Sequence, residues 1–137
     1  MRIFLDANVL FSAANQGSHI ARLVREVLVE QVGESVRMLT SDLAIVEAER
    51  NLRRKRPDWL PRFEDLLTNL EVVPTSSFPL PVELQAQDRP LLCAAIRARC
   101  SHFVTGDRRD FGHLFGQRVE GVLVVDLLTL AKLLTRL

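Results

Sequence analysis

Short apolar segments alternate with amphipathic helical segments along this chain, and that alternation restricts its fold more than any other feature. RIFL at residues 2–5, VRMLT at 36–40 and GVLVV at 121–125 are apolar runs of strand length. Strands that alternate with helices favour a parallel sheet covered on both faces. We therefore predict an α/β fold: a three-layer α/β/α domain with a central, mainly parallel sheet of four to five strands.

Turn and capping residues indicate where the other elements begin and end. Ser41 or Asp42 can cap one helix, Pro57 ends it, Pro90 is tolerated in the first turn of another, and Asp126 can cap the last. The other expected elements are a short helix after Asp6, helices over residues 19–32, 43–55, 58–70, 90–100 and 127–137, strands over 70–74 and 102–105, and a turn-rich segment over 106–116.

Length and cysteine content indicate one intracellular domain. The 137 residues suit a single domain over 1–137, because the parts on either side of the loop at 75–87 would make poor independent cores. If Cys93 and Cys100 are both helical, they lie about 10 Å apart, too far for a disulfide. We expect two buried thiols in a reducing compartment. With no signal-peptide pattern and no apolar run long enough for a bilayer, we expect a cytoplasmic location without membrane association.

Acidic residues follow the predicted strands repeatedly. Asp6 follows the first strand, Asp107 follows the strand at 102–105 after one glycine, Asp88 opens a helix, and Glu47 lies about two turns into another. Each has a simpler interpretation alone, since Asp is a favoured helix cap and Glu a common solvated helix residue. Helical phase favours Glu49 over Glu47, because Glu49 lies nearer the apolar stripe. The residues alone leave that choice open.

Taken together, these acids indicate a shared site, which none of them indicates alone. Sites in open α/β sheets form at the carboxyl ends of the strands, so the acids are expected in one crevice. Two like charges 4 Å apart repel by about 4 kcal/mol at an effective dielectric near 20. Such a group must take up protons or bind a cation, and carboxylate oxygens suit Mg²⁺ or Mn²⁺.

Three stretches resemble the PIN domain, a family best known from the nuclease toxins of VapBC-type toxin–antitoxin modules. They are IFLDANVLFSA at 3–13, TSDLAIVEAERNL at 40–52 and QDRPLLCAAIRARCSHFVTGDRRDF at 87–111. They occur in the family's order and cover nearly the whole chain. The third is the most specific, because it joins a helix-opening Asp, an apolar strand ending in VTGD and an RRDF tail.

The resemblance assigns the acids residue by residue. It implies that Asp6, Glu47, Asp88 and Asp107 are both the catalytic residues and the metal ligands. Glu47 rather than Glu49 is implied because the family's helical Glu comes six residues after a Ser or Thr, here Ser41. Asp110 is expected near the site but not as a ligand.

The resemblance also implies an activity. A PIN-like chain with all four acids would be a Mg²⁺- or Mn²⁺-dependent endoribonuclease, the toxin of a type II module, with RNA as substrate, an antitoxin protein as possible partner and a homodimeric assembly. Asn8, Ser41 and Thr105 are candidates to orient the carboxylates, although for Ser41 a capping role is favoured. Candidate RNA contacts are Arg53, Arg54, Arg108 and Arg109, in a chain with sixteen Arg, two Lys and a net charge of only +1.

Two other interpretations are compatible with some of these residues. Phosphatases of the haloacid dehalogenase kind use a D-x-D pattern after the first strand, but residues 6–8 read D-A-N and the two lysines, Lys55 and Lys132, are poorly placed. A non-catalytic PIN-like module that binds nucleic acid or a partner would keep the acids only as caps. An Mn²⁺-dependent gain in thermal stability separates the nuclease from the module.

Overall fold

Six strands form one sheet within residues 1–28 and 36–135, the part of the chain that the computed structural model describes. The strand order is β3-β2-β1-β4-β6-β5, and every neighbouring pair is parallel except β5 and β6. The mainly parallel α/β fold is thus confirmed, with one strand more than expected. The strands are β1 (Arg2–Leu5), β2 (Arg37–Ser41), β3 (Glu71–Val73), β4 (His102–Val104), β5 (Arg118–Val119) and β6 (Val122–Val125).

The additional strand is β5, which forms a tight hairpin with β6. Val119 pairs with Val122 across the two turn residues, Glu120 and Gly121. Both turn residues have positive φ angles, 49° and 87°, as the two-residue turns that match strand twist require. Glu is an uncommon residue at such a position, and β5 has only two residues, so the sequence carried little signal for this hairpin.

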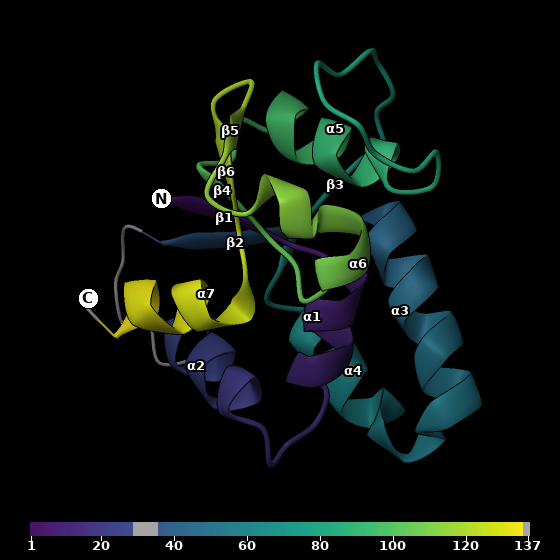
Figure 1. Ribbon diagram of the computed structural model, residues 1–137. Helices are drawn as coiled ribbons and strands as arrows, with labels where there is room; N and C mark the ends of the chain where they lie inside the picture. The colour runs from purple at the N-terminus through teal and green to yellow at the C-terminus, as the bar shows by residue number, and fades with distance from the viewer. Residues whose placement is uncertain (29–35, 136–137) are drawn as a thin grey trace.

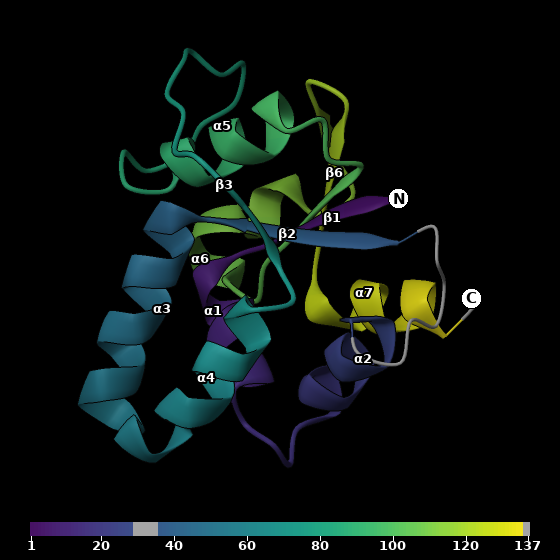
Figure 2. The same ribbon diagram turned by 180° about the vertical axis from the view of Figure 1, so that it is seen from behind.

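Helices cover both faces of the sheet. Helix α5 lies on one face, and α1, α2, α4 and α7 gather on the other (Figures 1 and 2). The α-helices are α1 (Ala7–Ala13), α2 (His19–Leu28), α3 (Asp42–Lys55), α4 (Leu60–Leu67), α5 (Arg89–Arg97), α6 (Arg108–Phe111) and α7 (Leu127–Leu134), with 3₁₀ turns at Pro57–Trp59 and Gly112–Leu114. Among the described residues, no helix combines the length and apolar character needed to cross a membrane.

Most helix boundaries lie within two or three residues of those expected. The prediction over 19–32 is described only as far as Leu28, and its remaining residues lie outside the described part of the chain. Helix α5 ends at Arg97, because Arg99 adopts the left-handed region (φ 57°). Cys100 therefore follows the helix instead of belonging to it. Both cysteines are buried and free, as expected.

A row of phenylalanine rings connects the central strands to α6. Phe4 on β1 stacks on its register partner Phe103 on β4, with ring centroids 5.3 Å apart, and Phe103 contacts Phe111 at 5.0 Å. All three side chains are fully buried. Since α6 has only four residues, its position depends on Phe111, which fixes the segment after β4 against the sheet.

We expect Phe111→Ala to lower the free energy of unfolding by about 3–5 kcal/mol, because it leaves a cavity beside Phe103. Urea unfolding followed by circular dichroism measures this loss. Leu128→Ala is the control: its side chain on α7 is 61% exposed, so the expected change is within about 0.5 kcal/mol. Equal effects of the two substitutions would contradict the anchoring role of Phe111.

Candidate functional site

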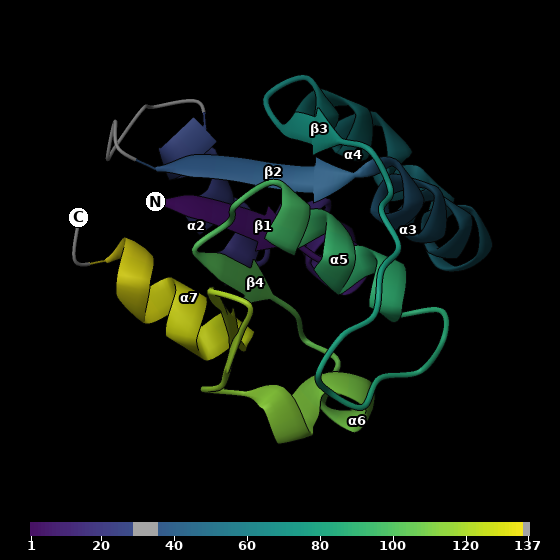
Figure 3. The same cartoon turned by 90° about the horizontal axis from the view of Figure 1, so that it is seen from above.

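A pocket of about 350 Å³ opens at the carboxyl edge of the sheet. Its lining residues come from α1, α3 and the segments before α5 and after β4, elements that Figure 3 shows from above. The structure brings Asp6, Glu47, Asp88 and Asp107 together in its wall. We call this the acidic pocket. Its lining residues are Asp6, Ala7, Asn8, Glu47, Asn51, Asp88, Gly106 and Asp107.

Asp6 is the most deeply buried acid of the pocket, at 3% exposure. It caps α1 through the backbone N–H of Ala7, which donates to Oδ1 at 2.8 Å. The hydroxyl of Thr105 donates to Oδ2 at 2.8 Å. Burial raises the pKa of Asp6 to about 6, and these two hydrogen bonds keep it from rising further. Asp6 is therefore a helix cap and a wall of the pocket at once.

Thr105 and Asn8 connect the ends of β1 and β4. The buried Thr105 Oγ1 accepts hydrogen bonds from the backbone N–H of Asp107 (3.0 Å) and from Nδ2 of Asn8 (3.2 Å). Oδ1 of Asn8 accepts from the backbone N–H of Gly106 at 2.7 Å. A Cβ added at Gly106 would lie 3.3 Å from this oxygen and 3.3 Å from Leu127, so glycine permits the close approach. Thr105 and Asn8 thus orient the segment that carries Asp107.

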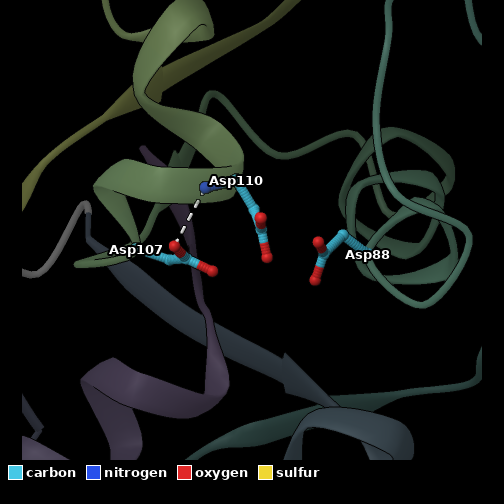
Figure 4. A group of neighbouring side chains, drawn as sticks. All are labelled: Asp88, Asp107 and Asp110. Atoms are coloured by element: carbon cyan, nitrogen blue, oxygen red, sulfur yellow. Dashed lines mark hydrogen bonds between the residues drawn. The ribbon is translucent and has the colours of Figure 1, made fainter.

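Asp88, Asp107 and Asp110 each place one carboxylate oxygen within 4.8 Å of the other two. We call these residues the Asp triad. Figure 4 shows the side chains of Asp88 and Asp110 pointing toward each other from α5 and α6, with Asp107 beside them. Asp107 caps α6 by accepting from the backbone N–H of Asp110 at 3.0 Å. Asp110 was expected near the site but not as a ligand. Its position three residues after Asp107, about one helical turn, brings its carboxylate to those of Asp88 and Asp107.

One carboxylate oxygen of Asp88 is buried without a hydrogen-bond partner among the described residues. This oxygen is Oδ2, and Asp88 as a whole is 7% exposed. It stands at the N-cap position of α5 but makes no capping hydrogen bond. Burial, followed by the carboxylate of Asp110, raises the pKa of Asp88 to about 7. An unpaired buried carboxylate facing other carboxylates is the arrangement that a bound cation relieves.

The donor set fits a hard divalent cation. All three members of the Asp triad offer oxygen, and Asp6 and Glu47 line the acidic pocket beside Asp88 and Asp107. Neither Cys nor His is among the described residues that line the pocket, and carboxylate oxygens are ligands of the hard kind that bind divalent cations such as Mg²⁺. The residues present are therefore able to hold a metal ion.

The structure also shows which of Glu47 and Glu49 lies at the acidic pocket. Glu47 lines the acidic pocket, where burial raises the pKa of its carboxyl and the charge of Arg50 lowers it. Glu49 instead accepts hydrogen bonds from Arg53 at 2.7 and 3.1 Å. Helical phase favoured the wrong residue because the apolar stripe of α3 faces the core, whereas the pocket lies beside the helix.

The remaining candidates occupy different surroundings. Ser41 caps α3 through the backbone N–H of Ala44 at 3.2 Å, which is the role favoured for it. Arg108 reaches Asp126 at 3.5 Å, and Arg109 is exposed. Arg54 donates to Oδ1 of Asn51 at 3.2 Å. Asn51 lines the acidic pocket and was not singled out in the sequence, where an Asn inside a helix carries no signal.

Solved structures share this fold, although no family model and no curated protein matches the sequence. A chain of VapBC2 from Rickettsia felis, solved with a DNA fragment from its promoter, is 12% identical with a TM-score of 0.64. A chain of VapBC-1 from nontypeable Haemophilus influenzae is 14% identical with a TM-score of 0.57. Each alignment covers 92% of this chain and 98% of the other. The molecule is thus an α/β domain with an acidic pocket, and its fold is PIN-like, as the resemblance implied.

We expect Thr105→Val to lower the free energy of unfolding by about 1–3 kcal/mol, because the buried carboxylate of Asp6 loses a donor. Thr105→Ser keeps the hydroxyl and is the matched control, with a smaller loss expected. Thermal or urea unfolding measures both. If Thr105→Ser is less stable than Thr105→Val, the hydrogen bond to Asp6 is not the main contribution of Thr105 to the free energy of unfolding.

The raised pKa values of Asp6 and Asp88 predict how stability depends on pH without metal. The folded protein keeps protons that the unfolded chain releases above 3.8, so these groups destabilise the fold as pH rises toward 7. We expect Asp88→Asn to gain melting temperature relative to the natural chain in EDTA, with a difference that widens from about pH 4 to about pH 7 and then stays constant. Asp65→Asn, on exposed α4, should show no such trend. A difference in melting temperature between Asp88→Asn and the natural chain that narrows as the pH rises would contradict the raised pKa of Asp88.

Proposed function

We propose that this chain is a divalent-metal-dependent endoribonuclease and the toxin of a type II toxin–antitoxin module. The observation that carries the proposal is the Asp triad: three carboxylates within 4.8 Å of one another, one with a buried, unpartnered oxygen, beside a pocket lined by two further acids. Concentrated negative charge in a pocket open to solvent is unfavourable unless a cation binds there. The PIN-like fold agrees with this proposal.

The chain's own residues have distinct parts in this proposal. Asp88, Asp107 and Asp110 would hold the cation, with Asp6 and Glu47 lining the acidic pocket beside Asp88 and Asp107. Thr105 fixes the carboxylate of Asp6 and also binds the backbone at Asp107, so both acids keep a set geometry. When bound, the cation would activate water for attack on a phosphodiester and neutralise charge on the phosphate.

A partner protein and self-association are part of the same proposal. The two solved structures described above come from VapBC complexes. We infer that this chain pairs with an antitoxin and forms a homodimer.

Expression of the natural chain in cells should arrest growth and yield cleaved RNA whose ends can be sequenced, and Asp88→Asn should abolish both effects. Light scattering of the purified chain determines its oligomeric state.

We expect the purified chain to cleave single-stranded RNA with Mn²⁺ or Mg²⁺ and to be inactive in EDTA. Mn²⁺ should raise the melting temperature. At an Mn²⁺ concentration a hundred times its dissociation constant, binding adds about 2.7 kcal/mol to the free energy of unfolding. Asp88→Asn and Asp6→Asn should lose both the cleavage and the Mn²⁺ effect. Because Asp88→Asn removes an unpaired buried charge, its inactivity would not reflect unfolding.

Asp65→Asn is the matched control for these substitutions and should keep full activity and the full Mn²⁺ response. Parallel reactions with single-stranded DNA test the preference for RNA. A chain whose melting temperature ignores Mn²⁺, and which leaves RNA intact, would instead be the non-catalytic module. Cleavage that persists unchanged in EDTA would contradict the metal-dependent chemistry.

A further inference from the structure

The acidic pocket alone repels the substrate that it is proposed to cleave. RNA is a polyanion, and the pocket wall carries four carboxylates: Asp6, Glu47, Asp88 and Asp107. A bound cation offsets only part of the negative charge of the carboxylates at the scissile phosphate. The phosphates of the neighbouring nucleotides are still repelled by the acidic wall. Binding of a single strand therefore requires cationic or donor groups directly beside the pocket.

Helix α3 supplies such groups beyond Glu47. Residues Arg50, Asn51 and Arg54 follow Glu47 by three, four and seven positions, which places them on the same side of the helix. Asn51 itself lines the acidic pocket. Arg50 lies close enough to Glu47 for its charge to lower the pKa of that carboxyl. The surface extends about 10 Å from Glu47 to Arg54, at 1.5 Å per residue.

The structure distinguishes the two neighbouring arginines on this helix. Arg53 donates two hydrogen bonds to Oε1 of Glu49, so its charge is matched within the protein. Arg54 donates to the neutral amide of Asn51, and no carboxylate pairs with it in the described part of the chain. Arg54 therefore keeps an unmatched positive charge beside the pocket.

The hydrogen bond from Arg54 also determines how the amide of Asn51 is oriented. Because Arg54 is a donor, it requires the oxygen of the amide, Oδ1, as acceptor at 3.2 Å. The Nδ2 group, for which the described residues show no acceptor, is left as a neutral donor at the pocket wall. A neutral donor can approach a phosphate oxygen without adding to the charge at the metal ligands.

We propose that the face of α3 formed by Arg50, Asn51 and Arg54 binds the phosphate of the nucleotide next to the scissile one. We call this surface the α3 phosphate face. Arg54 and Arg50 supply charge, and Nδ2 of Asn51 supplies a directed hydrogen bond. This inference rests on the proposed ribonuclease function. It adds the surface that holds the strand, which neither the fold nor the metal ligands specify.

Steady-state cleavage of a short single-stranded RNA with Mn²⁺ tests the proposal. Arg54→Ala and Asn51→Ala should each raise KM by about 10-fold, the loss of one hydrogen bond to a charged group, while kcat stays close to the natural value. Asn51→Asp should raise KM further than Asn51→Ala, because it places a negative charge where the phosphate binds. The Mn²⁺-induced rise in melting temperature should be unchanged in Arg54→Ala and Asn51→Ala.

Arg62→Ala is the matched control. Arg62 is an exposed arginine on α4 that lines other pockets, next to α2, and not the acidic pocket. Its removal changes the net charge by the same amount as Arg54→Ala, so it measures the non-specific effect of charge. Equal increases in KM for the two variants would overturn the α3 phosphate face and leave only a general electrostatic effect.

Binding to an uncleaved strand separates the two proposals. In an Asp88→Asn background, fluorescence anisotropy with labelled RNA gives the dependence of affinity on salt, whose slope falls by about 0.7 for each lost phosphate contact to a single strand. We expect that fall with Arg54→Ala and none with Arg62→Ala. If the natural chain cleaves RNA and both Arg54→Ala and Asn51→Ala behave like it, the α3 phosphate face alone would be contradicted. RNA that is bound through α3 but never cleaved would sink the ribonuclease function alone, and a chain that neither binds nor cleaves RNA would overturn both.

Discussion

The hydrogen bond from Thr105 to Asp6 joins the two strands on which the site depends. The backbone N–H of Asp6 donates to Val104 at 3.0 Å, so the pairing of β1 with β4 extends to the acid itself. Thr105 then donates to the carboxylate and accepts from Asp107. Asp6 and Asp107, just over a hundred residues apart in sequence, are held together by one buried hydroxyl. The rest of the acidic pocket is arranged around that pair.

The capping and ligating interpretations of the acids turn out to be compatible. Asp6 and Asp107 each use one oxygen to cap a helix, which leaves the other oxygen for a different contact. Capping fixes the side chain without consuming it, because a carboxylate has more acceptor sites than one N–H occupies. Asp88 stands at a cap position without a capping bond, and its burial together with the carboxylate of Asp110 raises its pKa to about 7.

Much of the fold was predictable because its signals are local. Apolar runs marked the parallel strands, and Ser41 and Asp126 marked helix starts, each through a hydrogen bond to a backbone N–H three residues on. Strand β5 was missed because two residues and an Glu-Gly turn carry almost no local signal. Within the site, Asn51 was not predicted and Asp110 was expected nearby but not as a ligand, for another reason. Their significance arises from Asp88 and the pocket, both distant in sequence.

By itself, the sequence determined the α/β class, the order of the elements and the set of acids at the strand ends, since periodicity and capping act over a few residues. The choice of Glu47 over Glu49 rested on family resemblance until α3 was placed beside the pocket. Only the tertiary structure decided that Asp110 joins Asp88 and Asp107, that Arg53 is matched by Glu49 and that Arg54 is not. These facts depend on distances between side chains from separate elements, which packing sets and local pattern does not encode.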